Sequence, residues 1–216
     1  MVNVICLKWG DKYSAAHVNR LYKLVQDNTT IKFNFICFTE DPSDIDSGIQ
    51  ITELPKNDVE SYWWKLWILT LEGHNVFFDL DIDIQNNIDE ILSYAPTKGV
   101  YVIPAEWKSV LGPTDGLTSI NSSIMIWDAQ CSIFQNRFIQ DPNYYQLKYD
   151  GNDDFMEQEF IDHINVLPSH WVYCKVWGYD QRDPKRHSRM VDGVYDMPER
   201  MICLYNGDLS KQYYSL

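Results

Sequence analysis

Three aspartates follow an apolar segment near the middle of the chain. Val76–Leu80 has the composition of a buried strand, and Asp79, Asp81 and Asp83 alternate along its end. Because alternate residues of a strand share a face, we expect the three carboxylates on one face. Their like charges raise one another's pKa, and a divalent cation removes this conflict. Carboxylate oxygens are hard ligands, which suit Mg²⁺, Mn²⁺ or Ca²⁺.

Two other interpretations of these aspartates stay open. They can be a solvated strand end that binds nothing. They can also belong to a calcium loop, because Asp79, Asp81, Asp83 and Glu90 match positions 1, 3, 5 and 12 of an EF-hand. That loop needs glycine at its sixth position, where this chain has Ile84, and the residues before it resemble a strand rather than a helix.

Composition limits the classes of protein to consider. The chain has 216 residues, of which 45% are hydrophobic and 23% charged, as is typical of soluble proteins with one core. There are 18 Lys and Arg against 31 Asp and Glu, which gives a net charge of −13. This balance argues against a partner such as duplex nucleic acid or an anionic membrane. An anionic small ligand is not excluded, because a bound cation reverses the local charge.

Targeting signals and disulfides are not expected. The first apolar run, Val2–Leu7, is short and interrupted by Asn3, which is unlike a signal peptide. No apolar stretch reaches 18 residues, so we expect no membrane insertion. The cysteines form no CxxC pair, and we expect buried, reduced thiols in a cytoplasmic protein. They are Cys6, Cys37, Cys131, Cys174 and Cys203.

Hydrophobic periodicity predicts alternating strands and helices. The expected strands are Val2–Leu7, Phe33–Phe38, Val76–Leu80, Val100–Pro104, Ser123–Trp127, Trp171–Val176 and Arg200–Tyr205. The expected helices are Ala15–Asp27, Ser61–Leu71, Ile88–Ser93, Asp128–Phe138 and Asp154–Ile164. This alternation predicts an α/β fold with a mostly parallel central sheet flanked by helices. Ligands of such sheets bind at the carboxyl ends of the strands.

Several segments, in order and over nearly the whole chain, resemble GT-A glycosyltransferases. They are similar to glycosyltransferase family 8 and to a related bacterial group. The segments are Leu7–Tyr13, His17–Tyr22, Phe35–Pro42, Tyr62–Leu66, Phe78–Asp81, Asn121–Ile124 and Gly151–Phe155. The resemblance implies a single Rossmann-like GT-A domain over residues 1–216, with a nucleotide-binding half (1–95) and an acceptor-side half (96–216).

The resemblance also implies an activity and a cofactor. Such proteins transfer a sugar from a nucleotide diphosphate sugar, usually a UDP-sugar, to an acceptor. Asp79 and Asp81 would hold Mn²⁺ or Mg²⁺, which bridges to the diphosphate. Asp83 either supports the metal ligands from behind or is exposed, and we expect it to be exposed. Near the C-terminus the family often has a metal-binding His before a Gly, where this chain has Asn206 before Gly207. Asn206 is therefore a candidate third metal ligand.

Donor-binding candidates follow the first expected strand and precede the acidic one. The resemblance places Trp9, Gly10 and Tyr13 at the nucleotide, where Gly10 lets the backbone approach and Tyr13 stacks on the base. Alternatively, this segment is a helix entry with Tyr13 in the core. Lys65 lies among aromatic residues and is expected to pair with Asp79 or with a phosphate. Alternatively, it is an exposed lysine of an amphipathic helix.

The resemblance implies that candidates from the second half contact the sugar or take part in the reaction. Asn121 and Ser122 resemble the family's element beside the donor sugar, or form an ordinary polar turn before a strand. Asp154 and Asp153 are the catalytic candidates, with Asp154 preferred, or one of them only caps a helix. An inverting enzyme needs a carboxylate base here, whereas a retaining one has an amide or carboxylate beneath the anomeric carbon.

Two other functional classes remain. One is another metal-dependent nucleotide-sugar enzyme, a nucleotidyltransferase or a phosphohydrolase. Nucleotidyltransferases usually have a Gly-rich basic loop after the first strand, and Lys8–Lys12 is too short and too poor in glycine for that. The other is a non-catalytic carbohydrate-binding module, which the 14% aromatic content favours. Metal-dependent binding of UDP discriminates against the latter.

Overall fold

A seven-stranded sheet forms the centre of the protein. The computed structural model describes residues 1–55, 59, 61–105, 118–129, 131–174, 190–191, 194–195 and 197–205. The strand order is β3-β2-β1-β4-β7-β6-β8. Four of the six neighbouring pairs are parallel, and β7 runs antiparallel to both of its neighbours. The strands are β1 (Val2–Lys8), β2 (Phe33–Thr39), β3 (Gln50–Glu53), β4 (Asn75–Phe78), β6 (Val100–Pro104), β7 (Ile120–Trp127) and β8 (Ile164–Val166).

Two smaller sheets complete the strands that the structure describes. The three-stranded sheet has the order β5-β12-β9, from β5 (Ile82–Ile84), β12 (Ile202–Leu204) and β9 (Val172–Cys174). β10 (Met190–Val191) and β11 (Val194–Tyr195) form an antiparallel pair. β5 follows β4 closely in the chain but belongs to a different sheet. The chain therefore turns sharply between them, at Asp79, Leu80 and Asp81.

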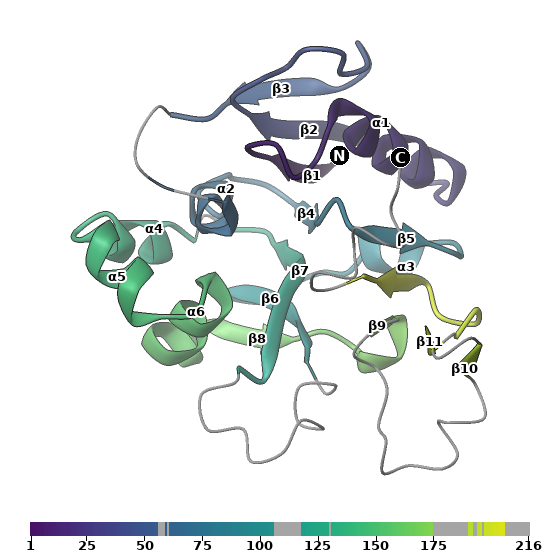
Figure 1. Cartoon of the computed structure of the whole chain (residues 1–216). Helices are drawn as coiled ribbons and strands as arrows, with labels where there is room; N and C mark the ends of the chain where they lie inside the picture. The colour runs from purple at the N-terminus through teal and green to yellow at the C-terminus, as the bar shows by residue number, and fades with distance from the viewer. Residues whose placement is uncertain are drawn as a thin grey trace.

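Helices cover both faces of the central sheet, and strand alternation sends side chains into both cores. Val76 and Phe78 of β4 face one core, and Phe77 faces the other. The first core is covered by α1 (Ala15–Asp27) and α3 (Asp89–Leu92). The second is covered by α2 (Lys65–Ile68), α4 (Ser132–Phe138), α5 (Pro142–Lys148) and α6 (Asn152–Phe160). Figure 1 shows α2, α4, α5 and α6 gathered on one side of the sheet.

The predicted mostly parallel α/β architecture is confirmed, and α1 has the predicted bounds. The predicted helix Ser61–Leu71 is wrong in form: a 3-10 turn, η1 (Ser61–Trp64), leads into the single turn of α2. The prediction that Asn121 and Ser122 precede a strand is also wrong, since both lie inside β7. Asn and Ser favour turns in general, but here the Ser122 side chain is buried and hydrogen-bonded.

Helix α6 begins and ends earlier than the sequence predicts. It starts at Asn152, directly after Gly151, and ends at Phe160. The turn η3 (Ile161–His163) and strand β8 follow it, and the turn η4 (Ser169–Trp171) precedes β9. Helix α5 and strands β3, β5 and β8 were not expected. β8 pairs with β6, so this late segment extends the central sheet.

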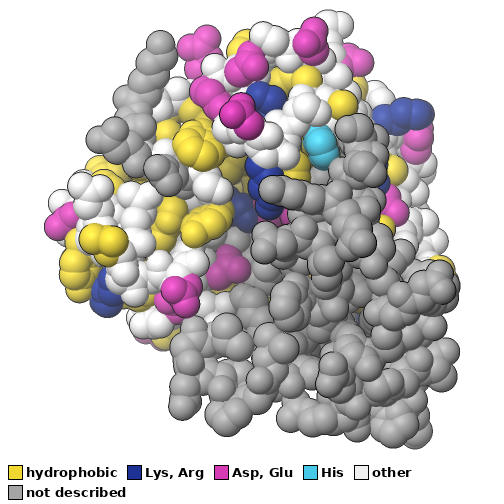
Figure 2. Space-filling model, viewed as in Figure 1, with side chains coloured by type: hydrophobic (Ala, Val, Ile, Leu, Met, Phe, Trp, Pro, Cys, Tyr) yellow, Lys and Arg dark blue, Asp and Glu magenta, His cyan; other side chains and the backbone are white. Residues whose placement is uncertain are grey.

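Surface and core agree with the composition. All five cysteines are buried and none forms a disulfide, as expected. Within the described residues, no helix has the length and apolar character needed to span a membrane. Acidic residues Glu40, Asp41, Asp44 and Asp46 of the β2–β3 connection are exposed. Figure 2 shows acidic side chains scattered over this part of the surface.

Candidate functional site

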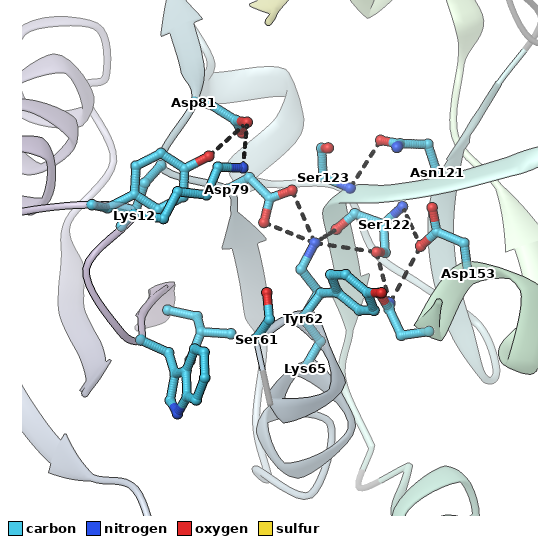
Figure 3. A pocket seen from close by; sticks show the side chains of 15 residues that line it. Lys12, Ser61, Tyr62, Lys65, Asp79, Asp81, Asn121, Ser122, Ser123 and Asp153 are labelled. Atoms are coloured by element: carbon cyan, nitrogen blue, oxygen red, sulfur yellow. Dashed lines mark hydrogen bonds and ion pairs between the residues drawn. The ribbon is translucent and has the colours of Figure 1, made fainter. Parts of the chain in front are cut away.

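A polar pocket lies at the carboxyl end of β4. β1 ends at the same edge because it is parallel to β4, and β7 begins there because it is antiparallel to β4. The pocket has a volume of about 240 Å³. Figure 3 shows side chains from the segments that follow β1 and β4, from β7, from η1 and from the start of α6 around it. The lining residues are Leu7, Trp9, Lys12, Tyr13, Ser61, Tyr62, Lys65, Asp79, Leu80, Asp81, Asn121, Ser122, Ser123, Asn152 and Asp153.

Lys65 is the buried cation of this pocket. Its Nζ atom lies 2.8 Å from Oδ1 and 2.9 Å from Oδ2 of Asp79. The same ammonium donates to the hydroxyl and the carbonyl oxygen of Ser122, at 3.2 and 3.3 Å. It also lies 5.1 Å from the centre of the Phe77 ring. Lys65 therefore connects the end of β4 to β7. The expected pairing of Lys65 with Asp79 is present in the structure. Its contact with a phosphate stays a prediction.

Asp81 is held by residues that follow β1. The Tyr13 hydroxyl donates to Asp81 Oδ2 at 2.8 Å, and Lys12 Nζ lies 3.9 Å from the same oxygen. Burial raises the pKa of Asp81, and the nearby charge of Asp79 raises it further. Lys12, the Tyr13 hydrogen bond and Lys65 act in the opposite direction. An additional cation at this carboxylate would relieve both penalties.

The chemistry of this donor set fits a hard divalent cation that also binds a ligand. The described residues contain no cluster of three or more His, Cys, Asp or Glu able to hold a metal by themselves. Mg²⁺, however, is usually bound through one or two carboxylates together with substrate phosphates and water. Asp79 and Asp81 supply two such carboxylates in one pocket. Asn206, the candidate third ligand, lies outside the described residues.

The expected face of three carboxylates does not form. The turn at Leu80 and Asp81 separates β4 from β5, so Asp83 belongs to a different strand from the one that leads to Asp79. Arg20 of α1 donates to Asp83 at 2.8 Å and to the carbonyl oxygen of Ile82 at 3.0 Å. Asp83 is therefore half-buried and ion-paired with α1, not simply exposed, and it does not line the pocket.

The residues expected at the nucleotide are only partly brought into the pocket. Trp9 and Tyr13 line it, and Tyr13 contacts Asp81 as described above. Gly10 does not line it: its N–H donates to Glu40 Oε1 at 2.6 Å. Its φ of +63° lies in the left-handed region, which accounts for the glycine. Stacking of Tyr13 on a base stays a prediction.

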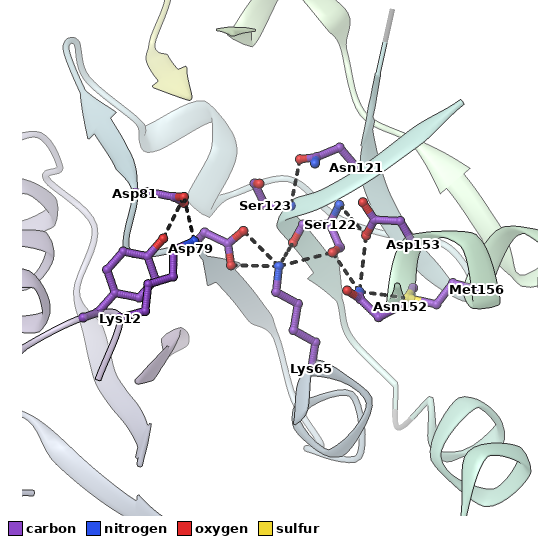
Figure 4. Close-up of polar contacts among 11 residues, drawn as sticks. Lys12, Lys65, Asp79, Asp81, Asn121, Ser122, Ser123, Asn152, Asp153 and Met156 are labelled. Atoms are coloured by element: carbon purple, nitrogen blue, oxygen red, sulfur yellow. Dashed lines mark hydrogen bonds and ion pairs between the residues drawn. The ribbon is translucent and has the colours of Figure 1, made fainter. Parts of the chain in front are cut away.

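Hydrogen-bonding groups from β7 and α6, uncharged except for Asp153, meet on another side of the pocket (Figure 4). The Asn152 amide donates to Ser122 Oγ at 2.9 Å and to Asp153 Oδ1 at 3.2 Å. The backbone N–H of Ser122 donates to the same Asp153 oxygen at 3.2 Å. Asn121 Oδ1 accepts from the N–H of Ser123 at 3.0 Å. This arrangement fixes Ser122 and Asp153 relative to Lys65.

The two catalytic candidates lie differently. Asp153 lines the pocket, whereas Asp154 does not. The Asp154 carboxylate accepts from the N–H of Asp150 at 3.3 Å and from the Gln158 amide at 2.5 Å. Asp154 lies one further step of about 100° around the helix from Asp153, and its side chain contacts Asp150 and Gln158 instead of the pocket. The structure thus brings the second-ranked candidate, Asp153, to the site.

Lys12, Tyr62 and Asn152 are among the lining residues that sequence reasoning missed. Each lies next to a residue that was singled out: Lys12 beside Tyr13, Asn152 beside Asp153, and Tyr62 within the aromatic segment that ends at Lys65. The glycine directly before Asn152 was a usable signal for the true start of α6. No sequence signal gave the contact between Asn152 and Ser122, which are 30 residues apart.

Comparisons with known proteins show likeness at the level of the fold. No family model matches the sequence, and no curated protein matches it. The galactosyltransferase LgtC, solved with donor and acceptor sugar analogs, aligns with a TM-score of 0.62 and 13% identity. The alignment covers 95% of this chain and 87% of LgtC.

Two longer proteins align similarly. The glycosyltransferase GlyE of Streptococcus pneumoniae TIGR4 gives a TM-score of 0.64 at 10% identity, over 96% of this chain and 56% of that one. The bifunctional glycosyltransferase WbbM gives 0.62 at 11% identity, over 96% and 46%. This chain therefore spans only about half the length of GlyE and WbbM. Together with the sheet order and the position of the pocket, these alignments show that the chain has the GT-A fold of these glycosyltransferases.

Proposed function

We propose that this protein is a glycosyltransferase that moves a sugar from a nucleotide diphosphate sugar, most simply a UDP-sugar, to an acceptor, using Mn²⁺ or Mg²⁺. One observation carries the proposal. Asp79, Asp81 and Lys65 meet at the carboxyl end of β4, next to uncharged hydrogen-bonding groups of β7 and α6. A diphosphate needs cations, a sugar needs neutral donors and acceptors, and this pocket offers both side by side.

The cationic groups would bind the diphosphate. Asp79 and Asp81 are the residues that would hold the metal, which when bound neutralises charge on the leaving diphosphate. Lys65 already contacts both oxygens of Asp79, so its ammonium is positioned to share its hydrogen bonds between Asp79 and a phosphate oxygen. Lys12, whose side chain is half exposed, adds a second positive charge at the same end.

Ser122 would donate a hydrogen bond to the ligand. Its oxygen already accepts from Lys65 and from Asn152. The Ser122 proton is therefore left for another acceptor, such as a sugar or phosphate oxygen. Asn121, whose amide oxygen accepts from Ser123, can present its NH₂ group in the same way.

Asp153 is the carboxylate proposed to act at the reacting centre. Two N–H donors, from Ser122 and Asn152, hold one of its oxygens. A carboxylate held in this way suits either a base for an acceptor hydroxyl or a group that stabilises positive charge at the anomeric carbon. The two roles predict inversion and retention, and the anomeric configuration of the product distinguishes them.

A donor screen tests the proposal. The protein is incubated with UDP-, GDP- and CMP-sugars, with Mn²⁺, with Mg²⁺ or with a chelator, and nucleotide products are separated. Slow metal-dependent release of UDP from one UDP-sugar supports the proposal. Release of UMP and sugar phosphate identifies a phosphohydrolase instead. Sugar binding without metal-dependent UDP binding identifies a carbohydrate-binding module.

A further inference from the structure

One aromatic ring of the pocket has no part in the proposed donor site. Tyr62 lines the pocket with 43% of its surface exposed, whereas the neighbouring Trp63 and Trp64 are 3% and 1% exposed and belong to the core. An exposed ring within a polar pocket offers a ligand an apolar surface with a hydroxyl at its edge. Of the other aromatic residues that line the pocket, Tyr13 hydrogen-bonds to Asp81, and Trp9 is partly buried against the second core.

The ring lies on the side of the pocket that carries Asp153. Figure 3 shows Tyr62 near Asp153, with Lys12 and Asp81 on the opposite side of Lys65. A diphosphate bound by Lys12 and Lys65, and by a cation held at Asp79 and Asp81, would therefore occupy the far side. A ligand that contacts Tyr62 would lie next to the carboxylate proposed to act on the acceptor hydroxyl.

Two backbone features, one at Ser61 and one at Gly151, accompany the position of the Tyr62 ring. Ser61, directly before Tyr62, has a φ of +50°, which is uncommon for a residue with a side chain. Gly151 lies directly before α6, and a Cβ atom added at this position would lie only 3.3 Å from Tyr62 Cε2. The ring therefore rests against the chain that leads into Asn152 and Asp153.

We propose that Tyr62 is the platform on which a sugar ring of the acceptor stacks, so that the acceptor is a carbohydrate. A pyranose ring has an apolar C–H face and hydroxyls at its edge. Stacked on Tyr62, it would direct a hydroxyl toward Asp153. This inference rests on the proposed function, since it assigns the donor to the other side of the pocket.

Binding of simple glycosides tests the proposal. Saturation-transfer NMR with methyl glucosides, methyl galactosides and maltose is recorded in the presence of UDP and Mn²⁺. The wild type is compared with Tyr62→Ala, with Tyr62→Phe and with Tyr144→Ala, a tyrosine that is 50% exposed on α5 outside the pocket. We expect Tyr62→Ala to weaken glycoside binding roughly tenfold, as for other aromatic stacking contacts. Tyr62→Phe and Tyr144→Ala should bind like the wild type, and UDP affinity measured by calorimetry should not change.

Each other outcome has a distinct meaning. Unchanged glycoside binding by Tyr62→Ala, or an equal loss in Tyr144→Ala, overturns the platform. Loss of UDP affinity in Tyr62→Ala, with Tyr62→Phe normal, overturns it in favour of stacking on the nucleobase. A wild type that binds UDP but none of the glycosides overturns the carbohydrate acceptor and leaves the proposed function intact. A wild type that binds glycosides but not UDP contradicts the proposed function, and the Tyr62 comparison still tests the platform.

Discussion

The pocket has two sides that are held together by different forces. The carboxylate side consists of two ion pairs. Lys65 lies 2.8 Å from Asp79, and Lys12 lies 3.9 Å from Asp81. The amide side consists of Ser122, Asn152 and Asp153, which are joined by N–H donors to oxygen acceptors and carry one charge. A substitution on the first side changes the charge that a ligand meets. A substitution on the second mainly changes geometry, so we expect smaller effects there.

The largest effect is expected for Asp81→Asn. The variant keeps the volume and the contact with Tyr13 but removes a buried negative charge that would hold the cation. We expect donor turnover to fall by about 10³-fold, as for loss of a strong electrostatic group. The control is Asp83→Asn, which removes a carboxylate of the same acidic run that pairs with Arg20 outside the pocket. Near-wild-type kcat for Asp81→Asn with Mn²⁺ would contradict the metal-site interpretation.

Asp153→Asn tests the amide side at its only charged group. If Asp153 acts on the reacting atoms, kcat should fall by roughly 10²-fold or more while UDP affinity is unchanged. The paired variant Asp154→Asn should stay within about threefold of the wild type, because Asp154 contacts Asp150 and Gln158 rather than the pocket. The reverse order of effects would return the catalytic role to Asp154.

The carboxylate side could be predicted from the sequence because its key residues are close in the chain and of unusual type. Asp79 and Asp81 follow a recognisable apolar strand, and a strand's carboxyl end fixes where they lie. Lys65 is the single cation of an aromatic segment. The prediction that Asp83 shares a face with Asp79 and Asp81 is wrong. Side chains alternate between faces only within one strand, and the chain turns between β4 and β5.

The amide side depends on tertiary pairing that the sequence does not encode locally. To choose between Asp153 and Asp154, one must know the exact residue at which the helix starts. Helix α6 begins two residues before the predicted position. Ser122 has the residue type of a turn, and its side chain contacts Lys65 and Asn152, which lie 57 and 30 residues away in the chain. The short strands β3, β5 and β8 were missed for the same reason: each is stabilised by its partners rather than by its own pattern.

Asn152→Ala should have a moderate effect. The substitution removes the amide that donates to Ser122 and Asp153, and a typical hydrogen bond contributes about 1 kcal/mol. We expect kcat to fall on the order of 5- to 10-fold with little change in UDP affinity. Asn165→Ala is the matched control, because its amide donates to the Lys98 carbonyl oxygen away from the pocket. An equal fall of kcat in both variants would mean that Asn152 acts only through stability.

The smallest effect on activity is expected at the other end of α6. Glu159 accepts hydrogen bonds from Tyr149 and Lys148 and pairs with Arg137, and these contacts, led by the one from Tyr149, lower the pKa of Glu159. A carboxyl whose pKa is lower in the folded state stabilises the protein above its ordinary pKa, and that contribution is lost as the pH falls through the folded value.

Glu159→Gln should therefore lower the urea midpoint at pH 7, and the difference from the wild type should shrink as the pH falls toward about 3. Because Glu159 lies about 9 Å along the helix axis from Asp153, kcat at pH 7 should be unchanged. Urea unfolding at both pH values, with kcat measured on the same samples, checks both expectations. A fall in kcat at unchanged stability would mean that the contacts of Glu159 also set the position of Asp153. Activity on the amide side would then depend on charged groups as well, as it does on the carboxylate side.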